Sequence, residues 1–376
     1  MKTNIIQTRQ AKLAKIMPDA NLDALVLNPG PSLTYLTGLH FHLSERPVVV
    51  IFTPDKSPAI VLPELETAKV KNLPYPMTAF PYGEDPDSWQ AAFQQAIQTA
   101  GVTKGKIGVE PRALRVLELR LLEQAAQRAA QRAEFVSAEA SIAALRMYKD
   151  APEIAAMRAA VDIAQGALQA TFSKIKVGVT EREISAELSL QLLRHGSDPR
   201  LPFFPIVSGG PNGANPHAVP SERPLASGDL LVIDYGANVD GYFSDITRTF
   251  AIGKVEPEFE HIAKIVLDAN TAGRAAVRPG VTAGEVDRAT RAVIAEAGYA
   301  RYYTHRTGHG LGLEGHEEPY IRGDSDLPLE AGMTFTIEPG IYLPDRAGVR
   351  IEDDVVVTPD GVESLTTLPR ELITLG

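Results

Sequence analysis

The chain has 376 residues, 44% of them hydrophobic and 22% charged, which is the balance of a folded protein of about two domains rather than a disordered or fibrous one. Its 37 basic and 47 acidic residues give a net charge of −10, which argues against a nucleic-acid partner. It contains no cysteine, so disulfides, thiol nucleophiles and thiolate metal sites are excluded, and any metal must be held by histidine and carboxylate groups.

The first part of the chain alternates short apolar strands with amphipathic helices, a pattern typical of a mixed α/β domain. The predicted strands and helices, in chain order, cover residues 23–28, 46–53, 58–63, 88–100, 112–130 and 135–138. We expect this N-terminal domain to span residues 1–145.

A helix start marks the beginning of a second domain, which we expect to span residues 146–376. Asp150 is a suitable N-cap residue, Pro152 falls in the first turn, and Glu153 stands at the third helical position. This pattern predicts a long helix that begins at Asp150 and covers residues 153–174.

The second domain combines further helices with apolar strands, which gives an α+β fold class. The predicted helices and strands lie near residues 181–195, 203–210, 230–250, 257–276, 283–298, 333–343 and 348–358. Residues 230–250 predict a hairpin, because Asp240 and Gly241 in its N-V-D-G turn tolerate positive φ. No apolar run approaches the roughly 18 residues that cross a bilayer, so we expect a cytoplasmic protein with no membrane partner.

Two aspartates stand at buried-looking positions of this hairpin. Asp234 ends the apolar run L-L-V-I, and Asp245 lies on the returning strand, so the two strands can bring both carboxylates to one face. Burying a bare carboxylate is costly unless it is paired or binds a cation. The alternative is a pair of turn-flanking aspartates that are solvated or hydrogen-bonded to backbone.

Two glutamates at similar positions favour a cation site. Glu338 follows the strand T-F-T-I, and Glu352 interrupts the strand G-V-R-I-E-D-D-V-V-V. Acids that point inward from three separate strands repel each other unless cations lie between them, and two divalent ions would satisfy this set.

His309 supplies a nitrogen ligand from the glycine-rich segment H-R-T-G-H-G-L-G-L-E-G-H, where glycines let the backbone approach a site closely. A single loop histidine is more often simply solvated. Here four of the eight histidines fall in loops punctuated by glycine or proline, and this concentration favours a site; they are His217, His305, His309 and His316.

Five segments together resemble the metallopeptidase family with the pita-bread fold, which contains methionine aminopeptidase, aminopeptidase P and prolidase. The segments are N-P-H around His217, D-Y-G-A-N-V-D-G-Y-F-S-D, H-R-T-G-H-G-L-G, I-E-P-G-I-Y and G-V-R-I-E-D, in family order within residues 215–354. The preceding α/β domain is similar to that of the proline-specific branch. The resemblance implies a creatinase-like N-terminal domain that serves dimer formation and covers the active site. It also implies a C-terminal pita-bread catalytic domain, whose curved antiparallel sheet is covered by helices.

The resemblance also implies two divalent metal ions per subunit. Asp234 would chelate one ion, Asp245 and Glu352 would bridge both, and His309 and Glu338 would complete the shell of the other. A carboxylate and imidazole site suits manganese, cobalt, zinc or iron, and family precedent favours manganese. The ion pair would activate a shared water as the nucleophile.

Catalytic and substrate-binding roles follow from the same resemblance. Glu338 would shuttle the proton to the leaving nitrogen, and His316 would stabilise the new negative oxygen. His217 and His305 would line the substrate pocket. Arg350, two residues before the last ligand, would orient Glu352 or its neighbours, the alternative being a surface salt bridge.

The expected function is therefore hydrolysis of the bond before proline, by an Xaa-Pro dipeptidase (prolidase) that acts as a homodimer. One alternative is an aminopeptidase P that acts on longer peptides, and another, of a different class, is a non-enzymatic peptide-binding module of the same fold.

Restriction to dipeptides requires a cation for the free carboxylate of proline. Archaeal-type prolidases carry an arginine four residues after the histidine that corresponds to His316, and here Tyr320 fills that place. Arg46, in a polar loop with His40 and His42, is the hypothetical carboxylate partner; the alternative is a surface pair with Glu45.

Overall fold

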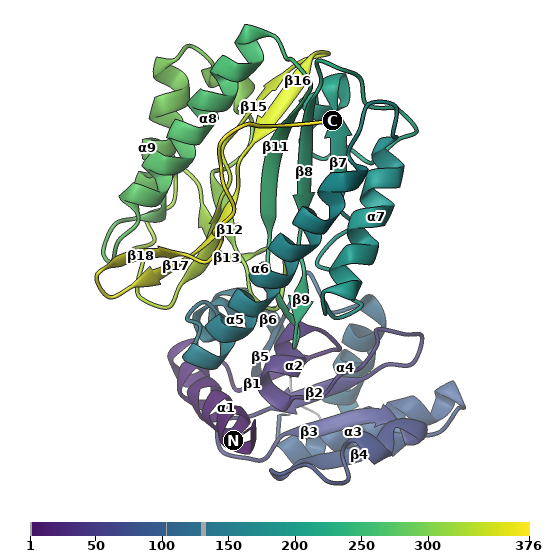
Figure 1. The fold of residues 1–376 in the computed structure, drawn as a ribbon. Coiled ribbons are helices and arrows are strands. Elements are labelled where there is room, and N and C mark those ends of the chain that lie inside the picture. Colours follow the sequence, from purple (N-terminus) through teal and green to yellow (C-terminus); the bar gives the residue numbers. More distant parts are fainter. Residues whose placement is uncertain (1, 103, 129–132) are drawn as a thin grey trace. The chain divides into compact units, whose positions relative to one another are not determined.

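The chain divides into two compact units, Met1–Arg146 and Met147–Gly376. Figure 1 shows a computed structural model, which describes residues 2–102, 104–128 and 133–376. In that part of the chain no helix is both long and apolar enough to cross a membrane.

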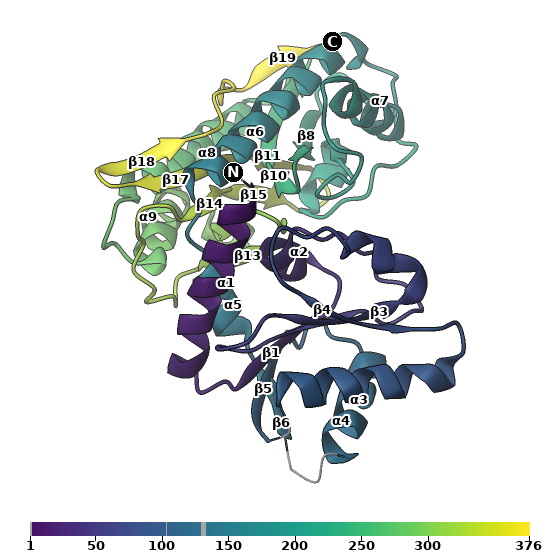
Figure 2. The same cartoon turned by 90° about the horizontal axis from the view of Figure 1, so that it is seen from below.

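The first unit is a six-stranded mixed sheet with helices on both faces. The strand order is β4-β3-β2-β1-β5-β6, with β1 antiparallel to β2 and parallel to β5. Helices α3 and α4 pack on one face of this sheet, and α1, α2 and α5 lie on the other (Figure 2). The bounds are α1 Lys2–Asp19, β1 Ala24–Leu27, α2 Pro31–Thr37, β2 Val49–Phe52, β3 Ala59–Pro63, β4 Thr78–Tyr82, α3 Trp89–Ala100, β5 Gly105–Val109, α4 Val116–Arg128, β6 Ala133–Ser137 and α5 Glu139–Arg146.

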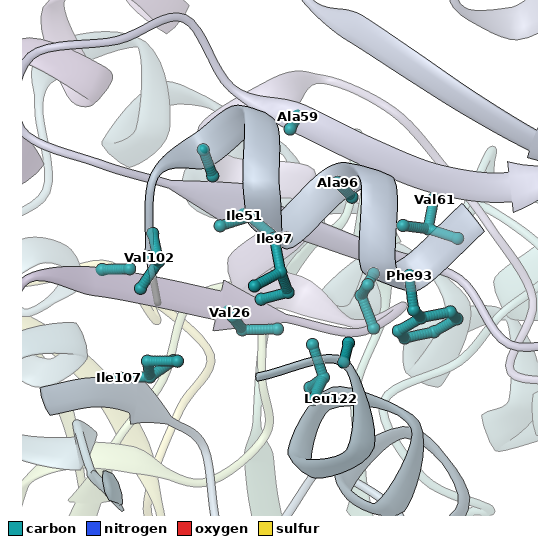
Figure 3. Close-up of a cluster of buried hydrophobic side chains, with 14 of the residues drawn as sticks. Val26, Ile51, Ala59, Val61, Phe93, Ala96, Ile97, Val102, Ile107 and Leu122 are labelled. Carbon is teal, nitrogen blue, oxygen red and sulfur yellow. The ribbon is translucent and has the colours of Figure 1, made fainter. Parts of the chain in front are cut away.

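Alternating apolar residues of the central strands form the core of this unit. Val26, Ile51 and Val61 point to one face of the sheet, where they meet Phe93 and Ile97 of α3 (Figure 3). Alternate residues of a strand point to the same face of the sheet, and residues four apart lie on the same side of a helix. The strand and helix side chains can therefore be buried against each other in one layer. The mixed α/β prediction is confirmed.

The helix predicted over residues 112–130 differs at its N-terminal end. It begins only at Val116, because the preceding residues form a turn in which the amides of Ala113 and Leu114 both donate to the carbonyl of Glu110. Residues 129–130 of the prediction lie outside the described residues.

Three of the four long helices described in the second unit, α6, α7 and α9, begin with a capping box. The four helices are α6 Ala151–Thr171, α7 Glu181–Arg194, α8 Pro257–Ala276 and α9 Ala283–Glu296. Asp150, Thr180 and Thr282 each accept a hydrogen bond from the third helical amide, and the glutamate there accepts one from the cap amide. The predicted start at Asp150 is confirmed.

The strands of this unit form two larger antiparallel sheets and two short hairpins. The sheet orders are β19-β11-β8-β7 and β13-β12-β14-β17-β18, and the hairpins are β9-β10 and β15-β16. Helices α6 and α7 pack beside β7 to β10, and α8 and α9 beside β13 to β16 (Figure 1). The bounds are β7 Ile206–Gly209, β8 Leu230–Tyr235, β9 Asn238–Val239, β10 Tyr242–Phe243, β11 Ile246–Ile252, β12 Gly308–Gly310, β13 Glu317–Ile321, β14 Thr334–Ile337, β15 Gly340–Leu343, β16 Ala347–Arg350, β17 Asp353–Thr358, β18 Gly361–Ser364 and β19 Ile373–Leu375.

The predicted hairpin is present, with Asp240 at φ 53° and Gly241 at φ 86° in its turn. Its strand β11 also gains a parallel partner, β19, which the sequence analysis did not predict.

The two C-terminal strand predictions need correction, because each segment breaks in two. Residues 333–343 divide into β14 and β15 at Glu338 and Pro339, and 348–358 contribute to β16 and β17 on either side of Glu352. Pro339 has no amide hydrogen for a ladder. The amide of Glu338 donates to the carbonyl of Thr307, and that of Glu352 to the carbonyl of Thr247. Both acids therefore stand where the chain changes sheets.

Replacement of Thr282 by alanine tests the cap of α9. We expect Thr282→Ala to lower the free energy of unfolding by about 1 kcal/mol, because the amide of Glu285 loses its acceptor. Thr282→Ser keeps the hydroxyl and should stay within about 0.5 kcal/mol of the wild type. Urea titration measures both, and an equal loss in the two variants would contradict the capping role.

Candidate metal centre and its cavity

The five predicted ligands come from five separate places, in or beside strands of the two larger sheets and at two chain breaks. Asp234 lies in β8, Asp245 directly precedes β11, and His309 lies in β12; Glu338 and Glu352 stand at the two breaks. In the β8-β11 ladder Asp234 is opposite Thr247 and not opposite Asp245, so the two aspartates are diagonal neighbours on one face.

Thr247 joins the two sheets at this point. It forms an isolated β-bridge with Glu352, and its hydroxyl donates to Glu352 Oε2 at 2.6 Å. Because Thr247 also faces Asp234 in the ladder, one residue brings the acids of β8 and of the β16-β17 break to the same place.

The ligand atoms converge in a buried cluster. Atoms of Asp245, His309 and Glu352 lie within 4.8 Å of one another, and these residues are at most 6% exposed. His309 Nε2 lies 3.3 Å from Glu338 Oε1 and 3.7 Å from Asp245 Oδ2. His309 Nδ1 lies 3.1 Å from the carbonyl oxygen of Gly310, which turns Nε2 toward the acids.

Burial and mutual repulsion dominate the electrostatics of the cluster. Burial, and then the charge of Glu352, raises the pKa of Asp245 well above its usual range. Burial, and then the charge of Glu338, does the same to the pKa of Glu352. Burial raises the pKa of Glu338 to about 7 against the opposing effect of Arg350. The positive charge near these carboxylates is too small to offset their mutual repulsion when they are ionised.

The cluster fits a hard divalent cation. Within the described part of the chain, Asp234 Oδ1 and Asp245 Oδ1 are buried with no hydrogen-bond partner. Burial also lowers the pKa of His309 well below its usual range, so its ring is neutral and offers a lone pair. Carboxylate oxygens and a neutral imidazole are the donors that manganese, cobalt, iron and zinc accept.

Arg350, predicted to orient Glu352 or its neighbours, is held against the predicted ligand Asp234. The guanidinium donates to Asp234 Oδ2 at 2.6 Å, and not to Glu352, and it also donates to the Tyr342 hydroxyl at 2.9 Å. Arg350 is 3% exposed, so the alternative of a surface salt bridge is wrong. Tyr342 had not been identified from the sequence, although it ends the segment I-E-P-G-I-Y.

A cavity of about 860 Å³ opens onto the ligands. The predicted substrate histidines His217, His305 and His316 all line it, together with the aromatic rings of Phe203, Phe204 and Phe243. His316 packs edge-on against His309 with ring centres 4.0 Å apart, and His305 Nε2 lies 2.8 Å from the Tyr342 hydroxyl. The structure thus gathers the three histidines above the acid cluster.

Two predicted residues lie outside this lining. The Tyr320 ring is stacked beneath the guanidinium of Arg306, which does line the cavity. Arg46 belongs to the first unit, where it pairs with Glu45 at 3.2 Å and Glu84 at 2.9 Å. Its role toward substrate stays a prediction.

Glu181 is a further site residue that the sequence analysis missed. It is fully buried, and its carboxylate accepts from the amides of Gly209 at 2.7 Å and Ser221 at 2.9 Å and from the side chain of Asn212. It therefore holds both ends of the segment that carries His217. Only its place directly after the Thr180 cap was visible in the sequence.

Comparisons with known proteins agree with this geometry. A model of metallopeptidase family M24 matches residues 155–359, and one of the creatinase/prolidase N-terminal domain matches residues 9–148. An Xaa-Pro dipeptidase from Lactobacillus helveticus is 34% identical over 367 residues, 96% of this chain and 97% of that protein.

Solved structures share the whole architecture. A dipeptidase from Pyrococcus horikoshii is 38% identical with a TM-score of 0.91, over 98% of this chain and 100% of that one. An X-Pro aminopeptidase from Thermotoga maritima is 28% identical with a TM-score of 0.84, over 97% and 99% of the two chains.

Asp245→Asn tests the charge balance of the cluster in two directions. With Mn²⁺ at about 100 times its Kd, the wild type should unfold about 5–10 °C higher than in EDTA. Asp245→Asn should lose most of that shift, yet in EDTA it should unfold no lower than the wild type, because one repelling carboxylate is gone. Asp240→Asn, at the exposed hairpin turn, is the matched control and should keep the full shift. Equal Mn²⁺ shifts in both variants would exclude a metal role for Asp245.

Glu181→Gln tests the anchor of the His217 segment. A glutamine cannot accept all the hydrogen bonds that Glu181 accepts, so hydrogen exchange at the amides of Gly209 and Ser221 should accelerate. The free energy of unfolding should fall by about 1.5–3 kcal/mol. Glu183→Gln, in the same turn but exposed, is the control and should leave both amides protected. Unchanged exchange in Glu181→Gln would contradict the anchoring role.

Proposed function

Because the chain belongs to metallopeptidase family M24 and has the creatinase/prolidase type of N-terminal domain, we propose that it is a metal-dependent Xaa-Pro dipeptidase. The observation that carries the proposal is the convergence of Asp245, His309 and Glu352 at the floor of a cavity lined by three histidines. The Xaa-Pro dipeptidase from Lactobacillus helveticus, with which it aligns over nearly its whole length, supports the choice of substrate.

Two divalent ions, which we propose to be manganese, would be held by Asp234, Asp245, His309, Glu338 and Glu352. When bound, they supply Lewis acidity toward the scissile carbonyl and toward water. A homodimer and a cytoplasmic location stay predictions.

The protein side chains then divide the remaining work. His316 projects into the cavity beside His309, and we assign it the hydrogen bond to the carbonyl oxygen of the scissile bond. Glu338 takes the proton of the attacking water on its carboxylate and passes it to the proline nitrogen, which leaves as an amine. His217 and His305 hold the substrate, His305 being oriented by the Tyr342 hydroxyl at 2.8 Å.

Arg350 and Tyr342 hold Asp234 in place. Arg350 is bonded to both, so Asp234 Oδ2 is fixed while Oδ1 stays available to a ligand. This arrangement leaves one oxygen of Asp234 for a cation without adding a net charge to the cluster.

Aminopeptidase P activity on longer peptides is the second candidate. Tyr320, in place of the arginine expected of archaeal-type prolidases, favours it, as does the likeness to the Thermotoga maritima X-Pro aminopeptidase. A non-enzymatic peptide-binding module would have no need of four converging acids with only Arg350 bound to one of them, so we set that alternative aside.

Hydrolysis of Ala-Pro with Mn²⁺ tests the proposal. The wild type should cleave it, and EDTA should abolish the activity until Mn²⁺ is restored. Glu338→Gln should lower kcat by about 10²–10⁴-fold, because proton transfer is lost. Glu296→Gln, at an exposed helix end, is the control and should retain full activity. A manganese-loaded wild type that cleaves neither Ala-Pro nor Ala-Pro-Ala would refute the function.

A further inference from the structure

Three arginines line the cavity, and they differ in what neutralises them. They are Arg200, Arg306 and Arg350. Arg350 is committed to Asp234 at 2.6 Å. Arg306 is half-buried, and no acid of the described residues lies within ion-pair distance of it. A half-buried cation that faces a cavity without a partner is suited to an anionic ligand.

The Arg306 guanidinium is held in a defined place. Its Cζ lies 4.5 Å from the centre of the Tyr320 ring. Tyr320 lies on β13, which pairs with β12, and is opposite His309 in that ladder. The backbone carbonyl of Arg306 lies 2.8 Å from His305 Nδ1, so the same residue also orients a cavity histidine. Stacking occupies one face of the guanidinium and leaves its N–H edges free for a planar carboxylate.

The charge of Arg306 acts on the catalytic residues. Burial has the largest effect on the pKa of Glu338, which it raises, followed by Arg350, which lowers it, and Asp234, which raises it; Arg306 comes next and lowers it. Arg306 also contributes to the lowered pKa of His316 and of His309, after burial in both cases. Arg306 lines the same cavity as these three residues, so a substrate bound there would lie within reach of its charge.

A dipeptide places its own charge near that bond. In Xaa-Pro the free carboxylate is only a few bonds from the scissile carbonyl carbon, so its partner must line the same cavity as the metal ligands. We propose that Arg306, stacked on Tyr320, binds the C-terminal carboxylate of the substrate proline and thereby restricts this enzyme to dipeptides. The inference rests on the proposed function and deepens it, because it names the residue that selects the substrate length.

This assignment explains why Tyr320 is compatible with dipeptide selection. The cation comes from the segment just before β12, and the aromatic ring of Tyr320 on β13 stacks against it. A longer peptide presents a neutral amide at the same point, so Arg306 would stay desolvated and unmatched. Selectivity then follows from the penalty on the longer substrate as much as from the attraction of the shorter one.

Matched substrates separate this role from a general one. Ala-Pro and Ala-Pro amide differ only in the charge at the C-terminus, Ala-Pro-Ala adds a residue, and Asp-Pro carries a second carboxylate before proline. We expect the manganese-loaded wild type to have a kcat/KM for Ala-Pro at least about 10-fold above that for the amide. Arg306→Gln should lower kcat/KM about 10- to 100-fold for Ala-Pro and less than about threefold for the amide and for Ala-Pro-Ala.

Further variants test the geometry. Arg306→Lys should recover part of the preference for Ala-Pro, because the charge is restored without the planar fork. Tyr320→Leu should lower the preference about two- to fivefold, and Tyr320→Phe, which keeps the ring, should not. Arg200→Gln is the matched control: Arg200 lines the same cavity and is exposed, 5.9 Å from the Phe243 ring, and its loss should leave the Ala-Pro to amide ratio within about twofold.

Several outcomes would overturn the proposal. Equal cleavage of Ala-Pro and its amide by the wild type would by itself overturn the proposal. So would an Arg306→Gln variant that retains the Mn²⁺-induced thermal shift but loses activity equally on both substrates. A loss of activity confined to Asp-Pro in Arg306→Gln would assign Arg306 to the side chain before proline. If Arg200→Gln removed the preference for Ala-Pro over its amide, Arg200 and not Arg306 would be the carboxylate partner. Turnover of the amide or of Ala-Pro-Ala by the wild type shows that the peptidase function stands even where the Arg306 assignment fails.

Discussion

The constraint on which the second unit depends is the burial of several carboxylates in one small space. Asp234, Asp245 and Glu352 are each at most 9% exposed, and Glu338 joins them from the cavity side. Mutual repulsion of such a set opposes folding unless positive charge is supplied. Arg350 supplies one charge, and the remaining deficit is what a bound cation would offset.

The fold meets this constraint by breaking its strands at the acids. Glu338 and Glu352 stand where the chain leaves one sheet for another, so their side chains are not fixed by a regular ladder on both sides. Thr247 and Asp354 then hold the backbone around them, Thr247 by its bridge to Glu352 and Asp354 by accepting the amide of Asp245 at 3.0 Å. The ligands are thus placed by rigid neighbours rather than by loops.

The cavity above the ligands is built from separate supports. The His217 segment is closed at both ends by Glu181, and His305 is oriented by Tyr342. The buried pair of Lys149 Nζ and Glu317 Oε1, 2.7 Å apart, stands beside His316. The three histidines that line the cavity from irregular segments therefore have polar anchors beside them.

Much of this arrangement could be predicted from local sequence. Asp234 and Glu338 stood out because a carboxylate ended an apolar run, and the helix start at Asp150 followed from cap spacing. What could not be predicted depends on contacts distant in the chain.

The partner of Arg350 is one such contact, because Asp234 lies 116 positions away. The anchoring of Gly209, Asn212 and Ser221 by Glu181 and the stacking of Arg306 on Tyr320 are others, since neither leaves a periodic or spacing signal. The sequence showed that acids interrupt both C-terminal apolar segments, but not that the chain changes sheets there, because apolar residues resume on the far side of each acid.

Anomalous diffraction at the manganese edge, from crystals of the manganese-loaded protein, tests the central claim most directly. Two manganese positions should appear among the five ligands, with Asp245 and Glu352 between them. No ordered manganese there, or manganese bound only elsewhere on the chain, would contradict the claim that these buried acids are assembled to hold metal.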